Sequence, residues 1–149
     1  MKIYLDTGNL DEIEHGLEYG VIDGVTTNPT LIAKEKVKFE SRVKEIVKLF
    51  YAHGVKDFTV SAEVTKTEAQ DMVDQAKKLA KISPHVVVKV PLTPEGIKAV
   101  KILADKNIRT NVTLCFTPGQ ALLIASLTSN ATFGSQLGRC PFPGSGFRK

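Results

Sequence analysis

Lys89 stands in the most apolar run of the chain, the segment Val-Val-Val-Lys-Val-Pro at residues 86–91. A lysine in a buried strand loses the water around its ammonium group, and this loss favours the neutral amine. A neutral amine can attack a carbonyl carbon and form a Schiff base. The alternative is a lysine whose stem covers the strand while its charge reaches water at the rim. Lys89 alone leaves both interpretations open.

Polar side chains also stand at the ends of the other β-rich runs. The residues at these ends are Asp6, Thr27, Asn28, Glu63, Asn111 and Thr113. Side chains two positions apart on a strand share a face, so Ser61 and Glu63 point the same way. Carboxylates close to a reactive amine are typical of enzymes that move protons during covalent catalysis. The pattern therefore favours the Schiff-base interpretation of Lys89.

Five β-rich runs carry these residues, at positions 3–6, 21–26, 57–63, 86–90 and 109–114. An apolar stripe with helical spacing follows each run. Residues typical of helix starts introduce these stripes, among them Asn9 with Glu12, Thr67 with Gln70, Thr93 before Pro94 and Thr117 before Pro118. Strands and helices that alternate about every 25 residues predict parallel strands with right-handed crossovers. We therefore predict an α/β fold.

Two α/β architectures have this rhythm, the doubly wound sheet and the TIM-type (β/α)8 barrel. A nucleotide-binding doubly wound sheet has a glycine-rich turn after its first strand, whereas this chain has Asp6-Thr7-Gly8-Asn9 there. A barrel places its active site at the carboxyl ends of its strands, where the polar residues stand, so we predict the barrel.

Length limits how much of a barrel the chain can form. A complete barrel takes about 200 residues or more, and this chain has 149. We therefore predict an incomplete barrel of five βα units with room for a sixth strand. The partial barrel is expected over residues 1–125, and a divergent, turn-rich stretch over residues 126–149.

Composition argues against several other classes of protein. The net charge is +4 and the pI about 9.1, but most lysines stand beside acids and there is no tryptophan, which is unlike a nucleic-acid-binding surface. A mild positive excess suits small anionic substrates. No apolar run approaches the ~20 residues of a membrane span, and the first residues do not resemble a signal peptide, so we expect a cytoplasmic protein without a membrane partner. We expect Cys115 and Cys140 to be thiols.

Metal chemistry is not expected either. His15, His53 and His85 have no common ligand spacing, and neither cysteine has a partner at a metal-binding spacing. We predict structural roles for the histidines.

Five segments in order along the chain resemble one family of enzymes. They are Asp6-Thr7, Gly24-Val-Thr-Thr-Asn-Pro-Thr-Leu31, Ser61-Ala-Glu-Val64, Val87-Val-Lys-Val-Pro91 and Thr110-Asn-Val-Thr-Leu114. Over residues 1–125 the chain resembles the small transaldolase and fructose-6-phosphate aldolase family of class I aldolases. The resemblance implies a barrel, sugar phosphate substrates and no metal or organic cofactor.

The resemblance also implies roles for individual residues. Lys89 resembles the lysine that forms the Schiff base, and Asp6 resembles the acid/base residue. Glu63 and Thr113 resemble the pair that holds a water molecule for proton transfer. Asn28 and Asn111 resemble side chains that bind the sugar hydroxyls and the intermediate, and we place Thr27 with them in substrate binding.

The C-terminal part departs from the family pattern. Residues 131–139 read Ala-Thr-Phe-Gly-Ser-Gln-Leu-Gly-Arg, where the family has a Ser-Pro-Phe-x-Gly-Arg motif. Arg139 resembles a remnant of the phosphate site, and no catalytic aromatic residue is assigned. An open sheet would expose strand edges, so we also expect a homo-oligomer.

Glu63 separates the two activities within the family, because transaldolases resemble this chain in having a glutamate at this position, where the fructose-6-phosphate aldolases carry a glutamine. We therefore expect a transaldolase that transfers a dihydroxyacetone unit between sugar phosphates, as in the pentose phosphate pathway. The alternatives are direct aldol cleavage of fructose 6-phosphate and a catalytically impaired barrel fragment.

Overall fold

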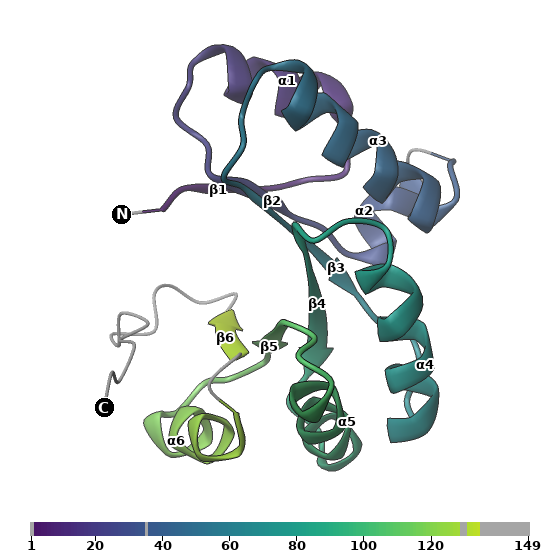
Figure 1. The fold of residues 1–149 in the computed structure, drawn as a ribbon, viewed down its shortest axis with the longest axis vertical. Helices are drawn as coiled ribbons and strands as arrows, with labels where there is room; N and C mark the ends of the chain where they lie inside the picture. The colour runs from purple at the N-terminus through teal and green to yellow at the C-terminus, as the bar shows by residue number, and fades with distance from the viewer. Residues whose placement is uncertain (1, 35, 129–130, 135–149) are drawn as a thin grey trace.

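The computed structural model describes residues 2–34, 36–128 and 131–134. Strands and helices alternate along the described chain (Figure 1). The strands are β1 (Tyr4–Asp6), β2 (Gly24–Thr26), β3 (Thr59–Glu63), β4 (Val86–Pro91), β5 (Thr110–Thr113) and β6 (Ala131–Gly134). The helices are α1 (Leu10–Glu18), α2 (Pro29–Lys34), α3 (Phe39–Ala52), α4 (Ala69–Ala80), α5 (Pro94–Asp105) and α6 (Pro118–Leu127).

All six strands are parallel and form one sheet in the order β1-β2-β3-β4-β5-β6. The sheet curves, and the helices lie along its convex side (Figure 1). Within the described residues, β1 and β6 each pair with a strand on one side, so the sheet is an arc that leaves the barrel open. This arrangement confirms the predicted α/β fold, the incomplete barrel and its sixth strand.

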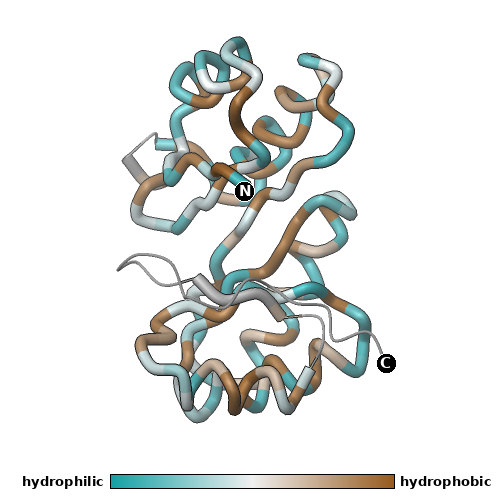
Figure 2. The backbone as a smooth tube through the Cα atoms, turned by 90° about the vertical axis from the view of Figure 1, so that its left-hand side faces the viewer, coloured by the Kyte–Doolittle hydropathy of each residue, from teal (hydrophilic) through white to brown (hydrophobic). Residues whose placement is uncertain are grey.

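The hydrophobic core lies between the sheet and the helices. The strands β2 to β5 send apolar side chains toward the helices, and these are fully buried: Val25, Val60, Ala62, Val88, Val90 and Val112. Apolar and hydrophilic residues alternate along the helices (Figure 2). The helical residues that complete the core include Ile13, Val43, Ile46, Phe50, Met72, Leu79 and Leu103. The strand residues that alternate with the buried apolar ones, among them Ser61, Glu63, Lys89 and Asn111, therefore point to the concave side.

Gly24 begins the second strand, which is shorter than the predicted run at residues 21–26. A Cβ atom at this position would lie 2.2 Å from the carbonyl oxygen of Thr59, so only glycine lets β2 approach β3 this closely. The residues before it do not enter the strand, and Val21 is exposed.

Two helix starts differ from the prediction. The structure begins α4 at Ala69, after an N-cap at Glu68 that makes no side-chain cap bond, and not at a Thr67 cap. The first N–H of α4, that of Ala69, donates to the Glu95 carboxylate at 3.2 Å. A side chain of α5 therefore provides the hydrogen-bond acceptor for this helix end. The short helix α2 was not predicted; Asn28 accepts from the N–H of Leu31 at 2.9 Å and so supports its first turn.

The other predicted helix starts are confirmed. Asn9 accepts from the second and third N–H groups after it, at 2.9 and 3.1 Å, and so starts α1. Thr93 accepts from the N–H of Gly96 before α5, and Thr117 forms a reciprocal capping box with Gln120 at the start of α6. These bonds fix where each helix leaves the carboxyl end of its strand, which is the end that carries the polar residues.

Candidate active site

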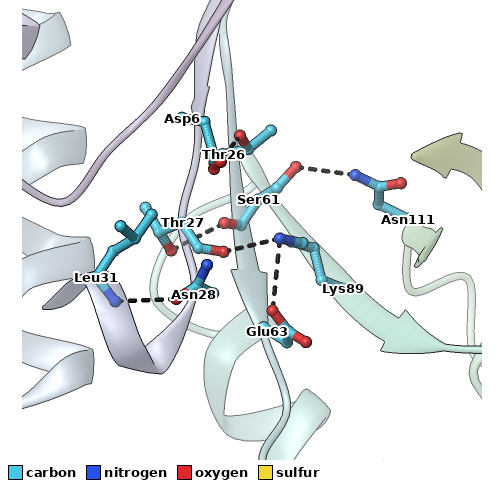
Figure 3. A network of polar contacts seen from close by, with 9 residues as sticks. All are labelled: Asp6, Thr26, Thr27, Asn28, Leu31, Ser61, Glu63, Lys89 and Asn111. Atoms are coloured by element: carbon cyan, nitrogen blue, oxygen red, sulfur yellow. Dashed lines mark hydrogen bonds and ion pairs between the residues drawn. The ribbon is translucent and has the colours of Figure 1, made fainter. Parts of the chain in front are cut away.

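The strand register brings the polar side chains into two rows on the concave face. In one row Glu63 stands opposite Lys89, and Lys89 stands opposite Asn111. In the other, Asp6 stands opposite Thr26, and Thr26 stands opposite Ser61. Ser61 and Glu63 are two positions apart on β3, so both rows share a face. Figure 3 shows Glu63 next to the amine of Lys89, Asp6 beside Thr26, and the amide of Asn111 turned toward Ser61.

Lys89 is buried, and its side chain is only 8% exposed. Its Nζ donates to the carbonyl oxygen of Thr27 at 3.1 Å and lies 3.4 Å from Oε2 of Glu63 (Figure 3). The amine is therefore held between a neutral acceptor and a carboxylate. This placement excludes the alternative in which the lysine charge extends into water at the rim.

Thr27 lies beside Lys89, but its hydroxyl does not face the open side of the sheet. The residue is fully buried, and both its N–H and its Oγ1 donate to the carbonyl oxygen of Ser61, at 2.9 and 3.0 Å. The backbone of β3 therefore engages the hydroxyl proton of Thr27, and the substrate-binding role of this side chain stays a prediction. Its carbonyl oxygen is the part that reaches the site.

Asp6 is exposed at the end of β1, and its Oδ1 accepts a hydrogen bond from the hydroxyl of Thr26 at 2.8 Å. This bond fixes one carboxylate oxygen and leaves the other available. Thr26 was not among the predicted site residues. The signal for it was its place one residue before the predicted polar strand end, opposite Asp6 in the register.

Two buried polar atoms on β5 have no hydrogen-bond partner in the described structure: Oδ1 of Asn111 and Oγ1 of Thr113. Buried polar atoms are nearly always paired, so an unpaired pair at one strand end indicates a place for a water molecule or a ligand. The Nδ2 of Asn111 lies 3.5 Å from Oγ of Ser61, which connects β5 to β3. Ser61 was not a predicted site residue either, although it shares a face with Glu63.

The remaining predicted residues are placed differently. Asn28 uses its Oδ1 for the first turn of α2, which leaves its amide NH2 group to contact a ligand. Arg139 lies outside the described residues, as does most of the stretch 126–149. The structure thus brings Lys89 and Glu63 into direct contact, places Asn111 opposite Lys89 in the strand register, and holds Asp6 on the neighbouring row.

In the described part of the chain, no cluster of His, Cys, Asp and Glu side chains could hold a metal ion. Nor does that part contain a helix with the length and apolar character needed to cross a membrane. His85 has a structural contact: its ring stacks on Phe58 with the centroids 4.1 Å apart, and its Nδ1 lies 3.0 Å from the carbonyl oxygen of the same residue.

Comparison with known proteins gives the same family as the motifs. Residues 3–136 match the family described as transaldolase/fructose-6-phosphate aldolase. The chain is 50% identical over 140 residues to a probable transaldolase of Geobacillus thermodenitrificans, covering 93% of this chain and 62% of the relative. It is 53% identical over 135 residues to a probable transaldolase of Kosmotoga olearia, covering 91% of this chain and 58% of the relative.

A solved structure supports the fold alone. The N-acetylneuraminate lyase of Mycoplasma synoviae superposes with a TM-score of 0.55 at 15% identity, covering 90% of this chain and 54% of that one. The chain spans about three fifths of the length of the curated relatives that it matches. With its motifs on the strand ends of a barrel-type sheet and a family match over residues 3–136, the chain belongs to the transaldolase/fructose-6-phosphate aldolase family.

Proposed function

We propose that this chain carries the chemistry of a class I aldolase of the transaldolase type. Lys89 forms a Schiff base with a ketose phosphate, and a dihydroxyacetone unit then passes to an aldose phosphate. The observation that carries the proposal is the position of the Lys89 Nζ, which is buried 3.4 Å from the Glu63 carboxylate. A buried amine next to a base is the arrangement that a carbonyl nucleophile needs.

The first step consumes one ketone and one ammonium group. Glu63 accepts a proton from Nζ, the free amine attacks the carbonyl carbon, and the resulting carbinolamine takes the proton back as it loses water. The net products are a protonated imine and water. Because Glu63 reaches Nζ directly, the carboxylate can move this proton without a second residue.

The second step breaks the bond between the α and β carbons of the iminium. The iminium nitrogen receives the electron pair, and a base removes the proton of the β-hydroxyl as the aldehyde leaves. Asp6 fits this role because Thr26 holds one of its oxygens at 2.8 Å and the residue is exposed to the concave side. Attack of the enamine on an acceptor aldehyde then reverses the proton transfer.

Substrate binding is assigned to the polar atoms that the protein leaves unpaired. Oδ1 of Asn111 and Oγ1 of Thr113 are buried and available as partners for sugar hydroxyls or for a water molecule shared with Glu63. The free NH2 group of Asn28 contributes a donor on the same side of the sheet. Arg139 remains a proposed phosphate contact.

Transfer is preferred over direct cleavage of fructose 6-phosphate because Glu63 stands where the aldolases have glutamine. Because the chain spans about three fifths of its relatives' length, the activity of the whole protein, its sugar phosphate substrates and its place in the pentose phosphate pathway are part of the proposal. A coupled assay with and without an aldose phosphate acceptor separates transfer from cleavage, and a folded chain inactive in both corresponds to the impaired fragment.

Self-association is proposed for the same chain. Leu122 and Leu123 on α6 are 71% and 47% exposed, and the edge strands β1 and β6 offer unpaired backbone groups in the described sheet. Light scattering after size exclusion is expected to give a mass above that of one chain.

The Schiff base is tested by trapping with borohydride. Incubation with fructose 6-phosphate and borohydride is expected to leave a reduced adduct on the peptide that contains Lys89. The Lys89→Met variant should remain folded and form no adduct, whereas Lys101→Met, which changes an exposed lysine of α5, should form it normally. An adduct on another lysine, or none on a folded wild-type chain, would overturn the assignment.

A further inference from the structure

We propose that Thr27 is a positioning residue for Lys89, and this inference rests on the proposed Schiff-base function. Thr27 comes directly after β2, whereas Lys89 is on β4, with β3 between them. The lysine side chain therefore crosses β3 to donate to the Thr27 carbonyl oxygen at 3.1 Å (Figure 3). The direction of that carbonyl decides where the amine rests.

The orientation of Thr27 is set by two hydrogen bonds to one acceptor. Its N–H donates to the Ser61 carbonyl oxygen at 2.9 Å, which continues the pairing of β2 with β3. Its Oγ1 donates to the same oxygen at 3.0 Å. The second bond adds nothing to the strand pairing, but it ties the side chain to β3 and restrains the peptide that follows, which carries the carbonyl facing Lys89.

The chemistry explains why a fixed carbonyl matters at this place. A neutral amine has two N–H bonds and one lone pair, and the lone pair must point at the ketone. An acceptor that holds one N–H fixes the direction of the lone pair. In the protonated imine a single N–H remains, and the Thr27 carbonyl can accept it while Glu63 returns to proton transfer. The positively charged imine that draws electrons from the breaking bond is thereby kept in place.

Valine at position 27 separates this role from a packing role. It has nearly the volume of threonine and retains the N–H, so the Ser61 carbonyl keeps one donor and no buried group loses its only partner. Serine keeps the hydroxyl and is the rescue variant. Thr110→Val is the matched control, because Thr110 is also a buried threonine and is on the helix-facing side of β5.

The experiment measures the rate at which the Lys89 adduct forms with dihydroxyacetone and borohydride. The thermal midpoint of unfolding is measured for each protein as a control for folding. We expect Thr27→Val to slow adduct formation by about tenfold, which corresponds to about 1.4 kcal/mol in the barrier. Thr27→Ser should restore most of the rate, and Thr110→Val should match the wild type.

A wild-type rate in Thr27→Val, with the wild type forming its adduct, would overturn the inference and leave the proposed function standing. Absence of an adduct in the wild type would instead count against the proposed function. In that case the inference is tested by the ratio of acetylated Lys89 to acetylated Lys101, measured by peptide mass spectrometry after chemical acetylation. If this ratio is the same in Thr27→Val as in the wild type, the inference is overturned. If Thr27→Val does not fold, Thr27→Ala takes its place with the same expectations.

Discussion

Replacing Glu63 with glutamine tests whether its carboxylate is bound to Lys89 as the structure places it. With 3.4 Å between Nζ and Oε2, the gross attraction is about 5 kcal/mol at an effective dielectric constant of about 20. Loss of water from the lysine, whose side chain is 8% exposed, offsets much of this attraction. Glutamine keeps one oxygen as an acceptor, so we expect Glu63→Gln to lower the free energy of unfolding by about 1–2 kcal/mol.

The same substitution should cost little once the lysine is gone. Methionine suits the buried β4 strand, but it leaves the Glu63 carboxylate, whose side chain is 27% exposed, without its partner, so Lys89→Met alone is expected to lower the free energy of unfolding by about 1–3 kcal/mol. In that background Glu63→Gln has no ammonium to lose, and its effect should fall below about 0.5 kcal/mol. The four proteins form a double-mutant cycle, measured by urea unfolding, with an expected coupling of about 0.5–2 kcal/mol.

A matched control is Glu14→Gln, the same chemical change at an exposed position of α1. Its coupling to Lys89→Met should be zero within error. A coupling below about 0.3 kcal/mol between positions 63 and 89 would refute the pairing. It would also remove the physical basis for Glu63 as the base that activates the amine, whatever activity the variants retain.

Two further perturbations test the fold and its pH dependence. Gly96→Ala would place a Cβ 1.9 Å from the carbonyl oxygen of Pro91, so we expect urea unfolding to show that the free energy of unfolding falls by about 2 kcal/mol or more. The control is Gly119→Ala, whose Cβ would lie 4.0 Å from the nearest atom and which should be neutral or slightly stabilising. Similar effects at both positions would contradict this expectation. The hydrogen bond from Lys98 lowers the pKa of the Glu95 carboxyl, so the urea midpoint of the wild type should fall as the pH drops below the ordinary value of 4.5. The midpoint of Glu95→Gln should fall less over the same pH range, because glutamine does not titrate. Identical pH profiles for the two proteins would contradict this expectation.

The alternation of the sequence predicted the fold because burial enforces it. Along β3 the apolar Val60 and Ala62 face the core, and Ser61 and Glu63 therefore face the concave side. The same rule placed Lys89 and Asn111 on one face of neighbouring strands. The alternation could not predict the start of α4, because the first N–H of this helix, at Ala69, donates to Glu95, which lies 26 residues later on another helix.

The details of the site depend on contacts between distant backbones. Nothing in the residue type of Thr27 distinguishes a hydroxyl that binds a sugar from one that binds the carbonyl of Ser61, because that choice is made by how β2 approaches β3. Ser61 and Thr26 were missed for the same reason: their importance comes from the register, which pairs them with each other and Thr26 with Asp6.

The strand order has a consequence for how the chain is made. In the described sheet each strand after β1 pairs with the strand before it in the sequence, so the described sheet can grow in the order of synthesis. Asp6 meets Thr26 after 20 residues, and Lys89 meets Thr27 after 62. A ribosome that has just released β4 has therefore already delivered the amine of Lys89, the carboxylate of Glu63 and the carbonyl of Thr27, and β5 and β6 extend a candidate site in which these three groups are already present.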